Sequence, residues 1–268
     1  MSTEEDRTKD LARMRDQVYK DPRPEEHFAR FHERARTRKP DWVYGMVRAL
    51  TTLYGAVAFR ARGVAAERVP PAGPLILAPN HFSFMDHFFV GMFLRRQVQF
   101  MAKSQLFKWP MQWVYTHGGV FPVRRGQEDQ EAFITAETIL ARGGCVVMYC
   151  EGGRSRTGKL AEQAKPGIGR LALESGATVV PVAIYGSQRV RNWKRLRFPQ
   201  VTVRYGEPIV FEKEPAATRE RQQEVADQVF GEIKRLYAAL DDPAARLRKE
   251  EGRGALRSLL RGTESGSI

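Results

Sequence analysis

The sequence predicts an α/β fold in which a mixed, mostly parallel sheet is flanked by helices and preceded by an amphipathic helical segment. Short apolar runs typical of buried strands alternate with longer stretches whose apolar residues recur at helical spacing. Charged side chains follow several of these strands, as they do at the carboxyl edge of an open α/β sheet. A hydrophobic content of 42% and an aromatic content of 10% indicate a globular core and argue against a disordered chain.

The 268 residues are long enough to bury a core and divide into three predicted parts. A charged arm with an amphipathic helix covers residues 1–56, the α/β domain covers 57–240, and a mobile basic tail covers 241–268. With 44 Lys and Arg against 31 Asp and Glu, the formal net charge is +13. This charge favours acidic partners such as anionic lipid headgroups, nucleic acid or an acidic carrier protein.

The amphipathic helix is predicted at 42–59, with Asp41 as its N-cap. A transmembrane helix is one interpretation, but the segment is at the short limit for spanning a bilayer. Arg48 would also cost about 2.5–3.5 kcal/mol near the bilayer centre. A helix lying in the membrane interface and a helix packed on the domain are the other interpretations. The first ten residues are acidic and polar and lack the basic and apolar regions of a signal peptide.

The elements of the domain follow in order after a turn at 70–73. A strand at 75–77 leads to a helix that begins at Ser83, and an aromatic-rich helix is marked by Trp109 and Trp113. The other predicted elements are strands at 98–101, 120–123, 145–149, 178–184 and 201–205, and helices at 130–141, 167–175 and 217–240.

Three residues in the predicted strands have specific consequences. Proline cannot donate to a ladder, so Pro181 predicts an edge position or a bulge for the strand at 178–184. Cys145 and Cys150 are separated by an odd number of positions, so they are predicted to point to opposite faces and not to pair. Without that pair the chain can form no internal disulfide, which fits a reducing compartment.

His81 and Asp86 lie just after the strand at 75–77. Two residues five positions apart within one helix lie roughly 140° apart around its axis and cannot meet. With His81 in the loop and Asp86 in the first helical turn, the carboxylate can hold one ring nitrogen and leave the other as a general base. The alternative is a capping box formed by Ser83 and Asp86, which requires no catalytic chemistry.

Two further charged pairs directly follow strands, Arg124 with Arg125 and Glu151 with Arg154. Arginine makes bidentate contacts to phosphate and carboxylate, and Gly152 would let backbone N–H groups approach an anion closely. Groups at the carboxyl ends of strands tend to line one crevice, so the sequence predicts a base beside an anion-binding pocket. A solvated loop is the alternative for the two adjacent arginines.

Other kinds of site fit the sequence poorly. A zinc site of the metallo-β-lactamase type requires His-x-His-x-Asp-His, but Phe82 and Phe84 stand where the first two histidines would be. No metal site is therefore predicted. The chain also lacks a Gly-x-Ser-x-Gly elbow, a Walker loop and a Gly-x-Gly-x-x-Gly fingerprint. His87 and His117 have no partner at useful spacing and are predicted to be structural.

Four motifs, in this order, resemble those of glycerolipid acyltransferases of the lysophosphatidic acid acyltransferase type. They are Asn80–Asp86, which contains His-x4-Asp, followed by Gly119–Arg125, Glu151–Ser155 and Val179–Val182. The resemblance runs from about residue 57 to residue 211. In the third motif, Tyr149, Cys150 and Gly153 stand where the family has Phe, Pro and Thr.

The resemblance implies an O-acyltransferase of phospholipid biosynthesis in which His81 and Asp86 are catalytic. The acyl donor would be a thioester on coenzyme A or acyl carrier protein, with no resident cofactor. The acceptor would be a lysophospholipid, foremost 1-acylglycerol-3-phosphate. It would be bound by five residues of the second and third motifs: Arg124, Arg125, Glu151, Gly152 and Arg154.

The resemblance also implies a location on the cytoplasmic face of a membrane, peripheral or monotopic, with the phospholipid surface as a partner. Nucleic acid is then not an expected partner. Two alternatives stay open at this point. One is an acyltransferase for a lyso-aminolipid without a phosphate, and the other is a non-catalytic basic protein that binds anionic membranes or nucleic acid.

Overall fold

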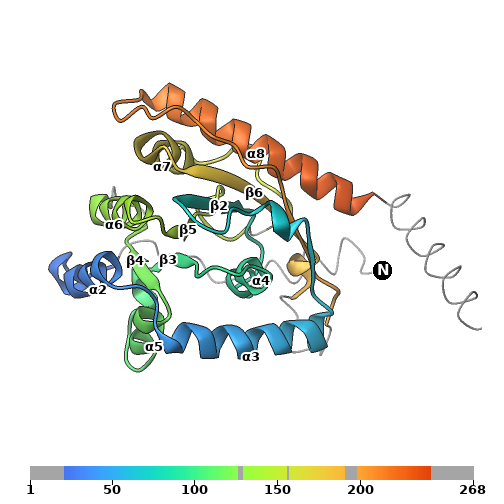
Figure 1. The fold of residues 1–268 in the computed structure, drawn as a ribbon, viewed down its shortest axis with the longest axis horizontal. Coiled ribbons are helices and arrows are strands. Elements are labelled where there is room, and N and C mark those ends of the chain that lie inside the picture. Colours follow the sequence, from blue (N-terminus) through green and yellow to red (C-terminus); the bar gives the residue numbers. More distant parts are fainter. Residues whose placement is uncertain (1–20, 126–128, 156, 191–197, 243–268) are drawn as a thin grey trace, which may run out of the picture.

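The computed structural model describes residues 21–125, 129–155, 157–190 and 198–242. Within these ranges, seven strands form one sheet in the order β1-β7-β6-β2-β5-β3-β4 (Figure 1). The strands are β1 (Arg62–Val64), β2 (Leu75–Pro79), β3 (Gln99–Lys103), β4 (Val120–Val123), β5 (Cys145–Val147), β6 (Thr178–Tyr185) and β7 (Thr202–Tyr205). The α-helices are α2 (Glu26–Thr37), α3 (Trp42–Phe59), α4 (Asp86–Met92), α5 (Met111–His117), α6 (Gln130–Ala141), α7 (Gly167–Ser175) and α8 (Arg219–Asp241).

Neighbouring strands run parallel throughout the sheet except for β6 and β7, which are antiparallel. The predicted mixed, mostly parallel sheet flanked by helices is therefore confirmed. The central strand β2 is buried along its whole length, between β6 on one side and β5 on the other. Parallel strands covered on both faces have continuous apolar sequences, which is why residues 75–77 could be predicted as a strand.

Successive side chains of the central strands β2 and β5 enter two separate cores. Ile76 and Val146 pack with α6, α7 and α8, whereas Leu75 and Val147 pack with α4. Figure 1 shows α7 and α8 on one side of the sheet, and α4 and then α3 on the other. Cys145 and Cys150 are free and lie in different cores, which confirms that they do not pair.

The prediction for Pro181 is half right. The edge position is wrong, because β6 lies between β7 and β2. The pairing of β6 with β7 nevertheless ends at Val182 and Tyr205. Beyond the end of β7, a single bridge joins Val179 to Ile209. Pro181 occupies this gap, where its carbonyl accepts a hydrogen bond from the backbone N–H of Gly206. An interior strand thus tolerates proline because its ladder is interrupted there.

The helix predicted at 42–59 is α3, and its N-cap is confirmed, because an Asp41 carboxylate oxygen accepts the Val43 N–H at 3.1 Å. The other Asp41 oxygen contacts Arg34 and His117, which ties the start of α3 to α2 and α5. His117 is therefore structural, as predicted. The predicted domain boundaries stay a prediction, and residues 1–20 and 243–268 of the arm and tail lie outside the described ranges.

Helix α3 packs on the domain with one side and exposes apolar residues on the other. Val43 and Tyr44 are buried, whereas Trp42 and Val57 are 67% and 71% exposed. The exposed apolar residues recur at helical spacing: Trp42, Met46, Leu50, Leu53, Tyr54 and Val57. No helix in the described part of the chain is long and apolar enough to cross a membrane.

Helices α7 and α8 touch at Gly169, where an added Cβ would lie 1.8 Å from the carbonyl oxygen of Gln222. We expect Gly169→Ala to lower the free energy of unfolding by about 1–3 kcal/mol, because two backbones must separate. Gly231 of α8 has no atom near its Cβ position, so Gly231→Ala should raise the free energy of unfolding by about 0.5–1 kcal/mol. Denaturant titration measures both changes, and wild-type stability of Gly169→Ala would contradict this packing.

Candidate active site

The candidate site begins at Asn80, where β2 ends. The Asn80 side-chain oxygen accepts the Ile184 N–H at 2.7 Å, and its amide nitrogen donates to the Ile184 carbonyl at 3.1 Å. This buried pair of hydrogen bonds extends the contact between β2 and β6 beyond the last strand residue. The chain therefore leaves the sheet in a fixed direction, and the next residue, His81, starts from a fixed position.

The predicted contact between His81 and Asp86 is present. His81 Nδ1 lies 2.9 Å from Asp86 Oδ2, and both side chains are buried. The same oxygen accepts the backbone N–H groups of Phe82 and Ser83, each at 2.7 Å. The helix begins at Asp86 rather than at Ser83, and its N-cap, Met85, makes no side-chain cap hydrogen bond, so the capping box of Ser83 and Asp86 is not formed. The Asp86 carboxylate instead holds the turn before the helix together with the imidazole.

The contact assigns the protons of His81. A carboxylate only accepts hydrogen bonds, so Nδ1 must carry the hydrogen and Nε2 keeps its lone pair. Burial lowers the pKa of His81, and the charges of Arg125 and Arg154 lower it further, although the hydrogen bond to Asp86 opposes them. The ring is therefore neutral at neutral pH, which is the state that a general base requires.

Residues of the third motif hold the backbone of His81. Glu151 accepts the His81 N–H at 2.8 Å with one oxygen and the Ala161 N–H at 3.0 Å with the other. The His81 carbonyl accepts the Ser155 N–H at 2.8 Å. Burial raises the pKa of Glu151 to about 7. Glu151 was predicted to bind the substrate, but both of its oxygens accept backbone N–H groups, so it positions His81.

Gly152 also differs from its predicted role. Its N–H donates to the Tyr149 carbonyl at 3.1 Å, so this donor closes a turn and is not directed at an anion. Its φ of +66° lies in the left-handed region, which glycine adopts without strain. The turn sets where the chain goes after β5, and the anion-binding role of this N–H was wrongly predicted.

The two adjacent arginines of the second motif separate. Arg125 lines the same cavity as His81 and Arg154. Arg124 is not among the lining residues; its guanidinium lies 3.3 Å from Glu25, and its backbone N–H donates to Asp129 at 2.6 Å. Neighbouring side chains at a strand end point in opposite directions, which accounts for the difference. The structure gives no support for substrate binding by Arg124.

The cavity has a volume of about 630 Å³, which is within the usual range for a binding site. Most of its wall is apolar and comes from α3, α4, β3 and α5, including Val47, Phe88, Phe100, Met101 and Val114. Its polar residues include His81, Arg125 and Arg154. In the described residues, no group of three or more His, Cys, Asp or Glu side chains is arranged to hold a metal ion.

Two residues of the site were not predicted. The Tyr149 ring stacks on His81 with centroids 3.9 Å apart, and the Tyr149 hydroxyl lies 2.7 Å from His87 Nδ1. His87, which was predicted to be structural, lines the cavity. Its position in the first turn of α4, directly after Asp86, was the signal that could have indicated this.

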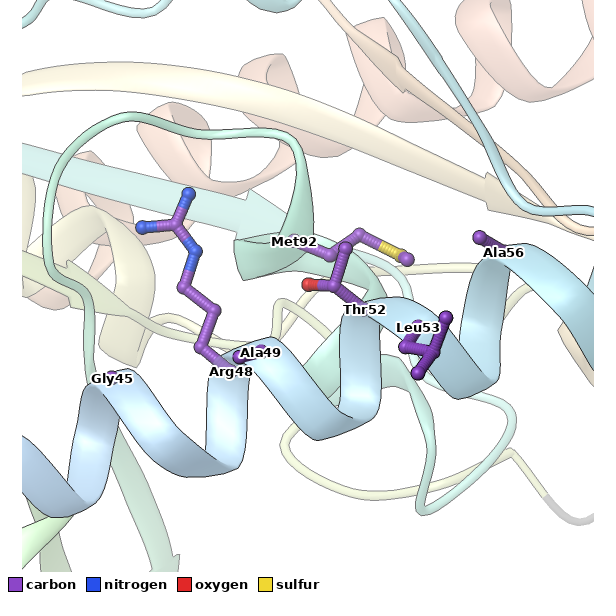
Figure 2. A pocket seen from close by; sticks show the side chains of 7 residues that line it. All are labelled: Gly45, Arg48, Ala49, Thr52, Leu53, Ala56 and Met92. Atoms are coloured by element: carbon purple, nitrogen blue, oxygen red, sulfur yellow. The ribbon is translucent and has the colours of Figure 1, made fainter.

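A second cavity, of about 540 Å³, is an open groove between α3 and Met92 of α4. Figure 2 shows Ala49, Thr52 and Ala56 along the helix, with Met92 lying over them. Arg48 lines both cavities and extends away from the helix in Figure 2. The side chain of Arg48 is therefore the boundary between the surface groove and the interior cavity.

The proton assignment of His81 can be tested by nitrogen-15 NMR of the histidine rings. We expect a neutral ring with hydrogen on Nδ1 and a pKa below the ordinary 6.5. In Asp86→Asn the pKa of His81 should fall further, because the hydrogen bond and charge of Asp86 are what raise it. His81→Gln identifies the resonance among the five histidines. A hydrogen on Nε2, or a pKa at or above 6.5, would contradict the assignment.

Comparison with known proteins identifies the domain. A family model described as Acyltransferase matches residues 61–185. A glycerol-3-phosphate acyltransferase of Aeromonas hydrophila is 30% identical over 40% of this chain and 15% of its own length. One from Shewanella frigidimarina is 27% identical over 60% of this chain and 20% of its own length. The matches thus span at most a fifth of these relatives.

The fold is similar to that of the crystal structure of the 1-acyl-sn-glycerophosphate (LPA) acyltransferase PlsC from Thermotoga maritima. The TM-score is 0.55 at 22% sequence identity, over 78% of this chain and 88% of that one. The region matched by the family model contains β2, the His81–Asp86 pair, Arg125, Arg154 and β6. Residues 61–185 therefore match the acyltransferase family, and the chain is similar to glycerolipid acyltransferases in sequence and in fold.

Proposed function

We propose that this protein transfers a fatty acyl group from a thioester donor to the hydroxyl of a lysophospholipid, foremost 1-acylglycerol-3-phosphate, in phospholipid biosynthesis. The observation that carries the proposal is the His81–Asp86 pair, which lies with Arg125 and Arg154 at one apolar cavity. A base, an anion-binding group and a space for an alkyl chain are the three requirements of this reaction.

In the proposed reaction, His81 Nε2 takes the proton of the acceptor hydroxyl as its oxygen attacks the thioester carbonyl. Asp86 holds the opposite nitrogen and stabilises the imidazolium that forms. The imidazolium then returns the proton to the departing thiolate. Direct transfer of this kind needs no metal and no covalent enzyme intermediate, because the imidazole both accepts and returns the proton.

The acceptor phosphate is proposed to contact Arg125 and Arg154. Both line the cavity, and both are close enough to His81 for their charges to lower its pKa. In the described residues, no ion pair joins Arg154 to a carboxylate, so its guanidinium is available to an anion. The names of the matched relatives and of the similar solved protein all contain a glycerophosphate acceptor, which supports the same assignment.

The apolar part of the cavity is proposed to hold the acyl chain of the donor. The donor would be acyl-CoA or acyl carrier protein, and either is a co-substrate rather than a resident cofactor. Both are anionic, so a chain with a net charge of +13 would attract them. The apolar walls exclude water from the thioester, which strengthens every electrostatic contact at the reacting carbon.

The exposed face of α3 is proposed to lie on the cytoplasmic surface of a membrane, as a peripheral or monotopic contact. It is continued by Trp109 and Trp113 near α5, and the rings of Trp42 and Trp113 are in contact. An amphipathic helix with aromatic residues on its exposed side is typical of interfacial binding. The groove along α3, which meets the cavity at Arg48, would then be a route for the alkyl chain.

His81→Ala is expected to lower kcat for acyl transfer by roughly 10²–10⁴-fold, the usual contribution of a general base. Circular dichroism should show an unchanged fold. Thioester release from acyl-CoA and from acyl carrier protein, measured beside vesicle and nucleic-acid binding, tests whether the wild type is an enzyme. Wild-type turnover in His81→Ala would defeat the mechanism, and binding without thioester release would favour a non-catalytic protein.

Arg125→Ala and Arg154→Ala are each expected to raise KM for 1-acylglycerol-3-phosphate by roughly 10–100-fold, because a charged hydrogen bond contributes about 1.5–3 kcal/mol. Arg124→Ala is the matched control, since this neighbour contacts Glu25 and does not line the cavity. A lyso-aminolipid without a phosphate should be a poor acceptor. An unchanged KM in both variants, or a preference for that aminolipid, would remove the phosphate assignment.

The double variant Leu50→Glu, Leu53→Glu should bind vesicles containing anionic phospholipid at least about 100-fold more weakly, because each buried leucine contributes about 1.5–3 kcal/mol. Val210→Glu is a control, since Val210 is 70% exposed and lies outside the α3 face. Equal loss of vesicle binding in both proteins would show that charge alone, and not this face, controls association.

A further inference from the structure

A second histidine lies beside the proposed base. The rings of His81 and His87 have centroids 5.1 Å apart, and both line the cavity. The His87 ring also meets Phe100 and Tyr149 edge to face, at 5.7 and 5.1 Å. Three ring contacts and one hydrogen bond, between Nδ1 and the Tyr149 hydroxyl at 2.7 Å, fix the orientation of His87. His87 has no role in the acyl-transfer mechanism proposed for His81 and Asp86.

The hydrogen bond to Tyr149 determines which nitrogen of His87 carries hydrogen. The Tyr149 hydroxyl is buried, and the one hydrogen-bond partner that the described residues offer it is His87 Nδ1. Burial raises the pKa of Tyr149 well above its usual value, so the hydroxyl stays protonated, and it donates a hydrogen bond to Nδ1 because the described residues offer it no other acceptor. Burial lowers the pKa of His87 well below its usual value, so the ring is neutral. Its single hydrogen is therefore on Nε2.

The Nε2 side of the His87 ring is also the side that can face the cavity. Tyr149 is not among the residues that line the cavity, so the Nδ1 edge of His87 faces its covered side. His87 nevertheless lines the cavity, which leaves the opposite edge, with its N–H, to reach the substrate. A neutral imidazole that is already held in place donates a hydrogen bond without reorganisation during the reaction.

We propose that His87 is a catalytic residue that donates a hydrogen bond from Nε2 to the thioester carbonyl oxygen, and that Tyr149 positions it. This inference rests on the proposed acyl transfer. The two neighbouring rings would then serve opposite sides of one reaction: His81 accepts the proton of the nucleophile, and His87 stabilises the charge on the oxygen. Tyr149 holds both histidines, since its ring stacks on His81 and its hydroxyl bonds His87.

In the proposed step, the acceptor oxygen forms a bond to the carbonyl carbon while its proton moves to His81 Nε2. The carbonyl π electrons move onto oxygen, which becomes an oxyanion that accepts the hydrogen bond from His87. When the carbonyl re-forms, the carbon–sulfur bond breaks, and the thiolate takes the proton back from His81. His87 keeps its own hydrogen throughout.

The test compares His87→Phe, which keeps a ring without a donor, with His87→Gln, whose amide places an N–H near the position of Nε2. Removing one oxyanion donor typically costs about 10²–10³-fold in kcat, and we expect this loss in His87→Phe with KM nearly unchanged. His87→Gln should recover at least tenfold of the loss. Tyr149→Phe keeps the stacking on His81 but frees the His87 ring, so kcat should fall by a smaller factor, about 3–10-fold. His27→Phe, on the exposed side of α2, is the control for this type of substitution.

Activity of His87→Phe equal to wild type would overturn the proposal. So would equal losses in His87→Phe and His87→Gln together with a shifted pKa in the pH profile of kcat/KM, because His87 would then act only by positioning His81. Wild-type protein without acyl transfer would instead defeat the proposed function. Transfer by the wild type that His81→Ala abolishes and His87→Phe does not would defeat the role of His87 alone.

Discussion

The hydrogen bond between Asp86 Oδ2 and His81 Nδ1 is the contact on which the rest of the site depends. Three donors converge on this one oxygen, two from the backbone of the loop and one from the imidazole. The other oxygen, Oδ1, is buried and has no hydrogen-bond partner within the described residues, so the hold on the ring rests on Oδ2 alone. The same carboxylate thus shapes the loop before α4 and sets the tautomer of His81. Removing its charge would change both together.

The third motif contributes mainly to position. Glu151 holds the amide of His81, Ser155 donates to its carbonyl, and Tyr149 covers its ring. These contacts are to the backbone of His81 or to the face of its ring. The loop is therefore fixed without using His81 Nε2, the nitrogen of the proposed base. Two arginines of the cavity, Arg125 and Arg154, follow two different strands, β4 and β5. An acceptor that bridges them would lie across the carboxyl edge of the sheet, beside the base.

Much of the fold and part of the site could be predicted from the sequence. Helical periodicity predicted α6 at 130–141 and α7 at 167–175 with the observed bounds, because apolar spacing and the glycines that follow each helix are local signals. The His81–Asp86 contact also followed from local spacing. What could not be predicted depends on long-range contacts. The interior place of β6 depends on β7 returning antiparallel, and the Arg124–Glu25 contact joins residues 99 positions apart. His87 was missed because its partner, Tyr149, lies 62 positions away.

The pH dependence of kcat/KM for acyl transfer tests the central claim most directly. His81 must be neutral to accept a proton, so activity should rise with pH through the ionisation of His81, and a second step near 7 would belong to Glu151. Burial and two arginines lower the pKa of His81 more than Asp86 raises it, so the midpoint should lie below 6.5 and match the NMR midpoint of His81. A midpoint at or above 6.5, or a rate that does not follow the ionisation of His81, would contradict a base held by Asp86.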